Sequence, residues 1–513
     1  MAEKFTQEQP AKAEALLRPT SVLRQWACWC VLFVISIALH IYSARADTNP
    51  DPFTYGQYGK QLLAGESLYD QILLDKPVLV PLIYALPQVL FPRSYLALKV
   101  MLAIVLAIQS LLFLVLIRPR FWAGLAASAL LMLLPLSYWD WEWPSSEHFS
   151  NLWIMGVLLA CWRTTTSQVS MAKAVVIGVL LGLGFLTRPA TAVYAAVPIA
   201  LILTSRESWQ KRGQFLVIIG VTGLAILVAS VGLVALLGSV HGYLYVLFVH
   251  PYHYAAQTYA PMSAKWLLVT CTHSMLLAAM ILAAIAATLS RFRVLLLVGL
   301  ACGLLAAIAP NRAFEHYLAH VFPATAIAIG CALSEPLGLP TSMRRSRMIW
   351  PDGLALFTAV VFAAGIAFEM RHRFREIALK DHSVWVAEKV AERIDDAVPK
   401  SGTLWVVGPM FSEKVRFASR RNHAYPIEST WELDLPEIFS LYKPADQILI
   451  DYLNHPPTAL AIHSTCATQL GSNDPSVQRL LWVRITLSLL HTYNYRKVSE
   501  AKPFYVLLRS PLR

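Results

Sequence analysis

The sequence predicts an all-α polytopic membrane bundle followed by a small α/β soluble domain. Hydrophobic residues make up 57 % of the 513 positions and charged residues only 14 %, whereas soluble domains are about 25 % charged. The apolar residues gather in runs near the roughly 20 residues that cross a bilayer. Residues 371–513, in contrast, have an ordinary soluble composition. Together these observations exclude disorder, collagen, a coiled coil and a small disulfide scaffold.

The N-terminal part of the chain predicts a retained membrane anchor. Residues 1–25 are polar and mixed in charge, and we expect them in the cytoplasm. The run 26–44 is long enough to span the bilayer and lacks an Ala-x-Ala cleavage site, so it differs from a removed signal peptide. Further spans are expected at 95–117, 121–138, 148–162, 214–238, 267–290, 294–309, 317–335 and 351–369.

Two shorter apolar runs, 174–186 and 190–204, are separated by Thr187-Arg188-Pro189. Proline disfavours helix at the preceding residue and cannot donate a backbone hydrogen bond. The pattern therefore predicts a hairpin or broken helix pair that bends at Arg188. Counted as two passes, this pair brings the prediction to about eleven transmembrane helices, contained within residues 26–370.

The basic residues indicate the orientation of the chain. Its net charge is +12, and we attribute this excess to the positive-inside rule rather than to nucleic-acid binding, because no basic stripe on a soluble face is visible. With the N-terminus inside, five basic clusters fall on the cytoplasmic side: Arg118/Arg120, Arg163/Lys173, Arg206/Lys211/Arg212, Arg291/Arg293 and Arg344/Arg345/Arg347. Residues 45–94 and 371–513 then lie outside.

Both outer segments have recognisable local structure. In the first outer loop, 45–94, a helix-like piece at 53–64 ends at Gly65, and a second at 78–90 contains Pro81 and Pro87. Apolar helices of this kind are typical of the membrane interface. The tail alternates helices near 383–398 and 477–490 with strands at 403–407, 458–463 and 504–509, which predicts a small α/β domain.

Charged residues gather at the predicted outer ends of the spans, where a charge is costly and a candidate for function. The candidates are Asp47, Asp51 and Lys76 in the first loop, Glu147 at the fourth span, Arg188 at the bend, and Arg312 and His316 before a late span. A carboxylate among aromatic rings has a raised pKa and suits a general base. Lysine and arginine hold phosphate. Sugar transfer from a lipid phosphate needs such a base and such cations, and a second carboxylate would stabilise the oxocarbenium-like transition state.

Each candidate also has a purely structural interpretation. Asp51 before Pro52 is also typical of a helix N-cap, and Asp47 of a solvated loop. Lys76 fits a snorkelling lysine, and Arg188 an arginine that pairs with an acid to close a broken helix. Glu147 fits a helix-dipole acid. Further along the chain, His316 fits a packed histidine, and the aromatic string between 138 and 143 fits an interfacial belt.

The order of these motifs resembles the GT-C membrane glycosyltransferases. Four segments carry the likeness: Asp51-x3-Tyr55 with Tyr69-Asp70 and Asp75-Lys76-Pro77; Ser146-Glu147; Gly182-Leu-Gly-Phe-Leu-Thr-Arg188-Pro189; and Arg312-x3-His316-Tyr317. The likeness is strongest to the bacterial branch related to protein O-mannosyltransferases and the lipid A aminoarabinose transferase, the glycosyltransferase family 39-like group. It covers about residues 26–370, and the tail matches only in kind.

The resemblance implies a transferase that uses a polyprenyl-phosphate-linked sugar, with no obligatory cofactor and no divalent metal. It implies Asp51 as the base, Lys76 and Arg188 as phosphate ligands, and Glu147 as a further acid. We group the remaining motif residues with the donor site: Tyr55, Tyr69, Arg312, His316 and Tyr317. The sequence departs from the family at Pro52, where an acid is usual, and at Val78, where a proline is usual; Asp47 therefore remains a rival base.

We therefore expect a glycosyltransferase in a bacterial inner membrane, with its active site and C-terminal domain on the periplasmic side. Its partners would be membrane lipids, the polyprenyl-phosphate donor, and a glycan, lipid or protein acceptor of the cell envelope. Two other hypotheses remain open at this point. One is a flippase or transporter for a lipid-linked or anionic substrate, since broken helices are typical of transporters. The other is a non-catalytic envelope assembly protein.

Overall fold

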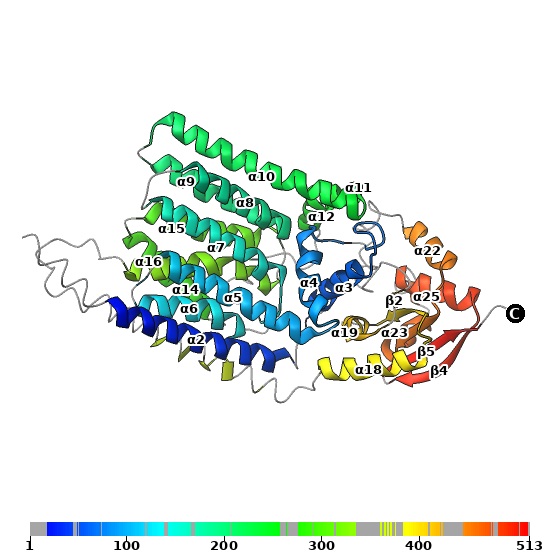
Figure 1. Ribbon diagram of the computed structural model, residues 1–513. Helices are drawn as coiled ribbons and strands as arrows, with labels where there is room; N and C mark the ends of the chain where they lie inside the picture. Colours follow the sequence, from blue (N-terminus) through cyan, green and yellow to red (C-terminus); the bar gives the residue numbers. More distant parts are fainter. Residues whose placement is uncertain are drawn as a thin grey trace, which may run out of the picture.

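The computed structural model places a helical bundle beside a C-terminal domain built on a small sheet (Figure 1). The structure describes residues 18–44, 49, 51–72, 74–117, 119, 121–137, 142–165, 170–205, 207–256, 263, 275–290, 292–311, 314–334, short pieces between 360 and 375, 383–408, 411–420, 422–423, 445–472, 474–475, 481–501 and 503–510.

The bundle helices lie side by side along one direction (Figure 1). They are α2 (Arg18–Ser43), α5 (Tyr95–Ile117), α6 (Phe121–Leu133), α7 (Ser146–Thr165), α8 (Met171–Thr187), α9 (Ala196–Thr204), α10 (Trp209–Leu237), α14 (Met275–Leu289), α15 (Arg293–Ile308) and α16 (Phe322–Ser334). Three short 3-10 segments adjoin these helices: η2 (Leu134–Ser137) follows α6, η3 (Pro189–Ala195) lies between α8 and α9, and η5 (Glu315–Val321) precedes α16. Small helical pieces follow α10, namely α11 (Val240–Leu244), η4 (Tyr245–Val249) and α12 (His250–Ala256).

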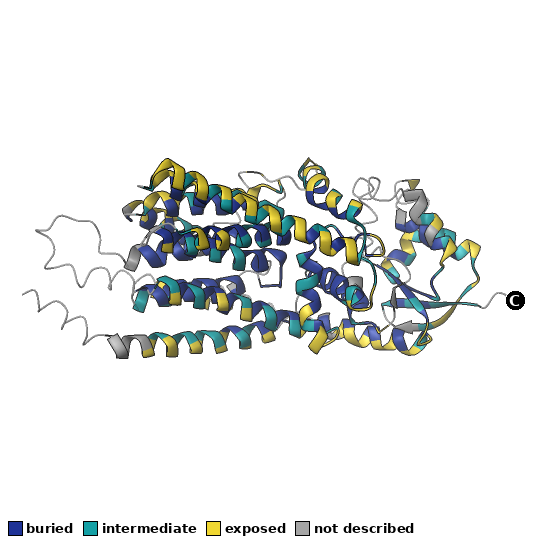
Figure 2. Ribbon diagram, turned by 45° about the horizontal axis from the view of Figure 1, so that its top comes forward, coloured by how far each residue is buried: buried dark blue, intermediate teal, exposed yellow. Residues whose placement is uncertain are grey.

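Helix α10 lies on the outside of the bundle and exposes one apolar face (Figure 1). Val217, Val221, Leu224 and Val228 are exposed and recur at the three- and four-residue spacing of one helix face. Figure 2 shows exposed residues along the outer side of this helix. The face toward the bundle buries Phe215, and the helix packs there against α8. An apolar stripe of this kind is what a lipid-facing helix requires.

The number of membrane passes stays a prediction. Among the described residues, three helices are long and apolar enough to cross a bilayer: Leu23–Ser43, Tyr95–Ile117 and Trp209–Leu237. Two other predicted spans contain a 3-10 segment and are not continuous α-helices: the run 121–138 ends in η2, and the run 317–335 begins within η5. Most of the predicted span 351–369 lies outside the described residues.

The predicted break at Arg188 is confirmed. Helix α8 ends at Thr187, Arg188 is extended with φ −151° and ψ 108°, and Pro189 opens η3. The chain turns there because proline cannot donate the next helical hydrogen bond. The turn leaves the Arg188 side chain at the C-terminal end of α8, where the partial negative charge of the last backbone carbonyls favours a cation.

The two predicted helices of the first loop are also confirmed. Helix α3 spans Asp51–Leu63 and α4 spans Leu79–Leu90. Gly65, with φ +86°, takes the left-handed conformation that ends α3. A Cβ on Gly59 would lie 2.5 Å from the Ala85 nitrogen, so only glycine permits this close packing of α3 on α4. Both helices lie at the end of the bundle that faces the C-terminal domain (Figure 1).

The C-terminal domain is an α/β unit, as predicted. Its sheet has the order β2-β1-β3-β5-β4, with β1 parallel to β2 and β3, and β5 antiparallel to β3 and β4. Its elements are α18 (Ser383–Ala397), β1 (Thr403–Val407), α19 (Phe411–Ala418), β2 (Asn422–His423), α22 (Ala445–Asn454), β3 (Ala459–His463), α23 (Ser464–Leu470), α25 (Leu481–Thr492), β4 (Tyr495–Ala501) and β5 (Phe504–Arg509). Alternate residues of β1 enter opposite cores: Leu404 packs with α18 residues, and Trp405 with α25 residues.

This domain packs directly on α3 through α19. The ring of Phe417 meets Phe53 edge-on at 6.0 Å between centroids, and Lys60 Nζ donates to the Ser419 carbonyl at 2.8 Å. On its other side, Phe53 stacks on Tyr95, the first residue of α5, at 4.3 Å. Helix α3 is therefore held between the C-terminal domain and the bundle.

Candidate active site

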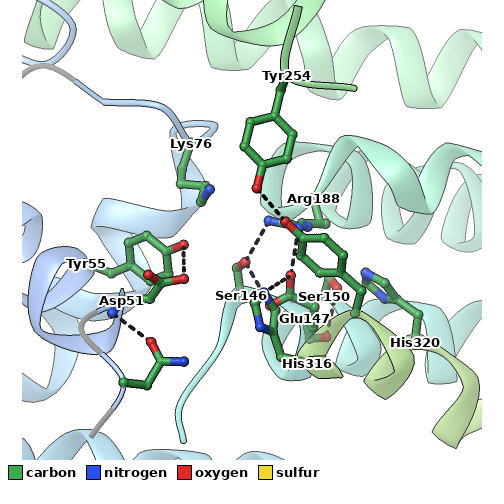
Figure 3. Close-up of polar contacts among 12 residues, drawn as sticks. Asp51, Tyr55, Lys76, Ser146, Glu147, Ser150, Arg188, Tyr254, His316 and His320 are labelled. Atoms are coloured by element: carbon green, nitrogen blue, oxygen red, sulfur yellow. Dashed lines mark hydrogen bonds and ion pairs between the residues drawn. The ribbon is translucent and has the colours of Figure 1, made fainter. Parts of the chain in front are cut away.

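Two groups of polar side chains face each other at the end of the bundle (Figure 3). The group from the first loop contains Asp51, Tyr55 and Lys76. The group from the bundle is larger and is drawn from α7, the α8–η3 break, α12 and η5: Ser146, Glu147, Arg188, Tyr254, His316, Tyr317 and His320. Residues far apart in the sequence thus converge on one place.

Arg188 and Glu147 form a buried ion pair. Their nearest atoms are 2.8 Å apart, and the side chains are only 9 % and 1 % exposed. An Arg188 nitrogen also donates to Ser146 Oγ at 3.4 Å, and that hydroxyl donates to Glu147 Oε2 at 3.2 Å. Both structural interpretations are therefore observed: Arg188 pairs with an acid, and Glu147 is an acid in the first turn of α7. A guanidinium group has five N–H donors, which is more than the contacts of Arg188 with Glu147 and Ser146 require.

Two tyrosines lie over this arginine. The Arg188 guanidinium lies 4.6 Å from the centre of the Tyr317 ring, a cation–π contact. The Tyr317 and Tyr254 hydroxyl oxygens are 2.8 Å apart, which joins η5 to α12. Arg188 thus has polar contacts with Glu147 and Ser146 and an aromatic contact with Tyr317.

Histidines complete the bundle side of the site. His316 Nε2 is 4.0 Å from Glu147 Oε1, and its ring meets Trp143 edge-on at 4.9 Å. His320 Nδ1 lies 3.2 Å from Asn151 Oδ1, and the Asn151 amide donates to the Ala319 carbonyl at 2.7 Å. These bonds fix η5 to α7. His316 is therefore packed among aromatic rings as well as close to the acid.

Asp51 begins α3 and faces the bundle group. Its backbone N–H donates to Asn49 Oδ1 at 3.0 Å, and Tyr55 OH donates to Asp51 Oδ2 at 3.3 Å. Burial raises the pKa of Asp51 above its ordinary value, although His316 and Lys76 act in the opposite direction. A carboxyl group with a raised pKa accepts a proton more readily than an exposed aspartate does.

Lys76 lies beside its neighbour in the chain. Its Nζ is 2.6 Å from Asp75 Oδ2 and 5.4 Å from the centre of the Tyr55 ring. Tyr69, expected in the donor site, contacts the backbone of the lysine. Its hydroxyl donates to the Lys76 carbonyl at 2.9 Å, and its ring contacts Tyr243. The structure thus brings Asp51, Tyr55 and Lys76 together, while Tyr69 supports their backbone.

Two predicted site residues, Asp47 and Arg312, lie outside the described residues. The structure also adds residues that the sequence analysis did not select. Tyr254 contacts Tyr317 and has no distinctive sequence signal, whereas Ser146 contacts Arg188 and Glu147 and stands in one of the motifs of the resemblance without having been selected for the site. Lys99 is different, because a lysine in an otherwise apolar span is a functional candidate by composition alone.

Lys99 anchors the segment that leads into the site. It is fully buried, and its Nζ donates to the Glu142 carbonyl at 2.7 Å and to Ser43 Oγ at 3.3 Å. From α4, the Tyr84 hydroxyl donates to the Pro144 carbonyl of the same segment. The segment before Ser146 and Glu147 is therefore tied to α5 and α4, and Lys99 is bonded in turn to α2.

The described residues contain no group of three or more His, Cys, Asp or Glu that could hold a metal ion. The expectation that no divalent metal is required stays a prediction. The described site contains hydrogen-bond donors, carboxylates and two cations (Figure 3).

No protein-family model and no curated sequence matches this chain. Solved structures do match. ArnT from Cupriavidus metallidurans in the apo state superposes with a TM-score of 0.59 at 16 % identity, over 93 % of this chain and 97 % of that one. ArnT from the same organism bound to undecaprenyl phosphate gives 0.57 at 16 % identity with the same coverage. The apo oligosaccharyltransferase of Archaeoglobus fulgidus gives 0.50 at 12 % identity, over 94 % of this chain and 74 % of that one.

These structures are GT-C glycosyltransferases. The chain therefore has the GT-C fold, and the resemblance seen in its sequence is confirmed at the level of the fold. The match covers the C-terminal domain as well as the bundle, since it extends over more than nine-tenths of the chain.

Proposed function

We propose that this protein is a membrane glycosyltransferase that moves a sugar from a polyprenyl-phosphate-linked donor to a cell-envelope acceptor. The reaction would take place at the periplasmic face of a bacterial inner membrane. The observation that carries the proposal is the convergence of one carboxylate, Asp51, and two cations, Lys76 and Arg188, at one end of a GT-C bundle. The ArnT structure with bound undecaprenyl phosphate supports the choice of a lipid phosphate.

Lys76 and Arg188 would hold the phosphate. Arginine binds phosphate through a planar fork and lysine through a compact charge. The two side chains approach the same space from opposite sides (Figure 3). Their positive charges repel each other there, and a phosphate between them would relieve that repulsion. Both would also stabilise the negative charge that develops on the leaving phosphate.

Asp51 would be the general base. It would take the proton of the acceptor hydroxyl while that oxygen bonds to the anomeric carbon of the sugar. The bond between this carbon and the phosphate oxygen would break, and polyprenyl phosphate would leave with both bonding electrons. Burial among Tyr55 and the bundle residues favours proton uptake by Asp51.

Glu147 would act through Arg188 rather than on the sugar. Its contacts to Arg188 and Ser146 occupy the carboxylate that a direct acid role would need. Asp47 and Arg312 keep the roles expected from the sequence, as a rival base and a donor ligand.

A transporter for a lipid-linked substrate is the second candidate. The helix break at Arg188 favours it, because discontinuous helices form substrate sites in transporters. The two candidates differ in their products: a transporter leaves the glycosyl phosphate intact.

The test is incubation of the purified chain with a panel of polyprenyl-phosphate sugars and envelope acceptors. Mass spectrometry then detects the released lipid phosphate and the glycosylated acceptor. We expect both products from the natural chain and neither from Lys76→Ala. Flux of intact donor across proteoliposomes, with no released lipid phosphate, would instead establish the transporter.

A further inference from the structure

Each cation of the site has a carboxylate of its own. Arg188 is paired with Glu147, and Lys76 is paired with Asp75 at 2.6 Å. The two pairs differ in their access to water. The two cations are similarly buried, with Lys76 13 % and Arg188 9 % exposed, whereas the Asp75 side chain is 24 % exposed and that of Glu147 only 1 %. The Lys76–Asp75 pair therefore reaches the accessible part of the site.

Surrounding residues limit where Lys76 can point. Tyr69 holds the lysine backbone through its hydroxyl, and Tyr69 itself has the left-handed φ of +60°, which is uncommon for a residue other than glycine. The Tyr55 ring lies against the ammonium group. Left-handed backbone conformations of residues other than glycine are found preferentially at functional sites. The loop is thus built to present this lysine in one direction.

Several charged or titratable groups act on Lys76. They come from its own segment, α3, the α8–η3 break, α12 and η5: Asp75, Asp51, Tyr55, Arg188, His250 and Tyr317. Burial by itself would lower the pKa of Lys76, but the charge of Asp75, its hydrogen bond with the ammonium group and the nearby Tyr317 together outweigh burial and raise that pKa. Burial also opposes the charge of Asp75, yet Lys76 and then His250 hold the pKa of Asp75 below its ordinary value. Both partners therefore stay ionised together.

We propose that Asp75 is a positioning residue, which keeps the Lys76 ammonium group oriented toward the lipid phosphate. The inference rests on the proposed function, because it assigns Lys76 to that phosphate. An ammonium group has three N–H donors. One stays with Asp75, and the others are available to phosphate oxygens. Asp75 thus orients the Lys76 side chain in the same way that Glu147 orients the Arg188 side chain.

The test measures binding of undecaprenyl phosphate to the purified full chain between pH 7.5 and 10.5. Phosphate monoesters have a second pKa near 6, so the ligand charge stays constant in this range. We expect Asp75→Asn to bind about tenfold more weakly at pH 7.5, since a charge-assisted hydrogen bond no longer orients the lysine. Its binding should also decline at a lower pH than that of the natural chain, because burial then lowers the pKa of Lys76 without the opposing Asp75 charge.

Further variants separate this role from a purely structural one. In Asp75→Asn/Lys76→Arg the decline with pH should disappear, since a guanidinium group stays protonated. Asp75→Glu keeps a carboxylate and should follow the pH profile of the natural chain. Asp70→Asn removes an exposed carboxylate of the same loop and is the matched control, with unchanged binding expected.

The outcomes distinguish the inference from the function on which it rests. Equal binding and equal pH profiles for Asp75→Asn and the natural chain, with binding lost in Lys76→Ala, would overturn the role of Asp75 alone. No binding by the natural chain would overturn the proposed function as well. If Asp75→Asn fails to fold, Asp75→Glu still tests the inference: a pH profile shifted from that of the natural chain, although the carboxylate is kept, would contradict it.

Discussion

The guanidinium group of Arg188 lies 2.8 Å from the carboxylate of Glu147, and both side chains are almost fully buried. The two residues come from different helices, at the start of α7 and at the end of α8. The pair therefore fixes both the break in the bundle and the orientation of one proposed phosphate ligand.

Replacing Glu147 by alanine should destabilise the protein and weaken its binding of lipid phosphate. Loss of one partner from a buried pair costs about 3–5 kcal/mol, because the other charge is left uncompensated. Thermal unfolding in detergent and undecaprenyl phosphate binding measure the two effects. The control is Glu207→Ala, which removes an ion pair to Lys211 that is 63 % exposed on the lysine side; exposed pairs contribute about 0–1 kcal/mol. Equal effects of the two substitutions would contradict the account.

Replacing Asp51 by asparagine should abolish transfer and stabilise the fold. General-base catalysis contributes about 10²–10⁴-fold to rates. The raised pKa of Asp51 means that its ionised form is disfavoured in the folded protein, so the charge reduces stability at neutral pH. A neutral asparagine removes that cost, and the thermal midpoint should rise. A variant that keeps full activity would pass the role of base to Asp47.

The pH dependence of transfer should reflect the raised pKa of Asp51. A general base must be deprotonated, so kcat/KM falls as the pH drops through its pKa. Burial raises that pKa above the value of an exposed aspartate, and the acid limb should therefore lie at a higher pH than an exposed aspartate would give. Folding stability moves the other way: the protonated form is favoured in the fold, so stability falls as the pH rises from the pKa of Asp51 in the unfolded chain to its raised pKa in the fold. An acid limb at or below the ordinary aspartate pKa, near 3.9, would rule out Asp51 as the base.

Replacing Phe417 by alanine should uncouple the C-terminal domain from the site. Phe417 is 1 % exposed and packs on Phe53 of α3. Removal of a buried phenylalanine costs about 3–5 kcal/mol, and hydrogen exchange in α3 should accelerate. Val498→Ala, at a half-exposed position of the same domain, is the control. Unchanged exchange in α3 would show that α19 does not hold this helix.

Local patterns predicted much of the fold. Both helices of the first loop, the break at Arg188, and strands β1 and β5 lie where the sequence indicated, because proline, glycine and alternating apolar residues act over a few positions. Strand β4 was not predicted. Its sequence, Tyr-Arg-Lys-Val-Ser-Glu-Ala, is mostly polar, and it pairs only with β5 at the edge of the sheet. Such an edge strand lacks the apolar alternation of a central one.

The site was harder to predict than the fold, because its contacts join distant parts of the chain. The ion pair between Arg188 and Glu147 depends on the packing of α7 on α8, which no local pattern encodes. The same is true of Tyr254, which has no distinctive sequence signal and joins the site through its hydrogen bond with Tyr317. Lys99 could have been found from sequence, since a charge in an apolar span needs a partner.

The central claim is that Lys76 and Arg188 hold one lipid phosphate close to Asp51. An experimental structure of the chain with bound undecaprenyl phosphate tests it most directly. The account predicts the phosphate between Lys76 Nζ and the Arg188 guanidinium group, with direct hydrogen bonds to both. A phosphate bound elsewhere, or in contact with neither cation, would contradict it.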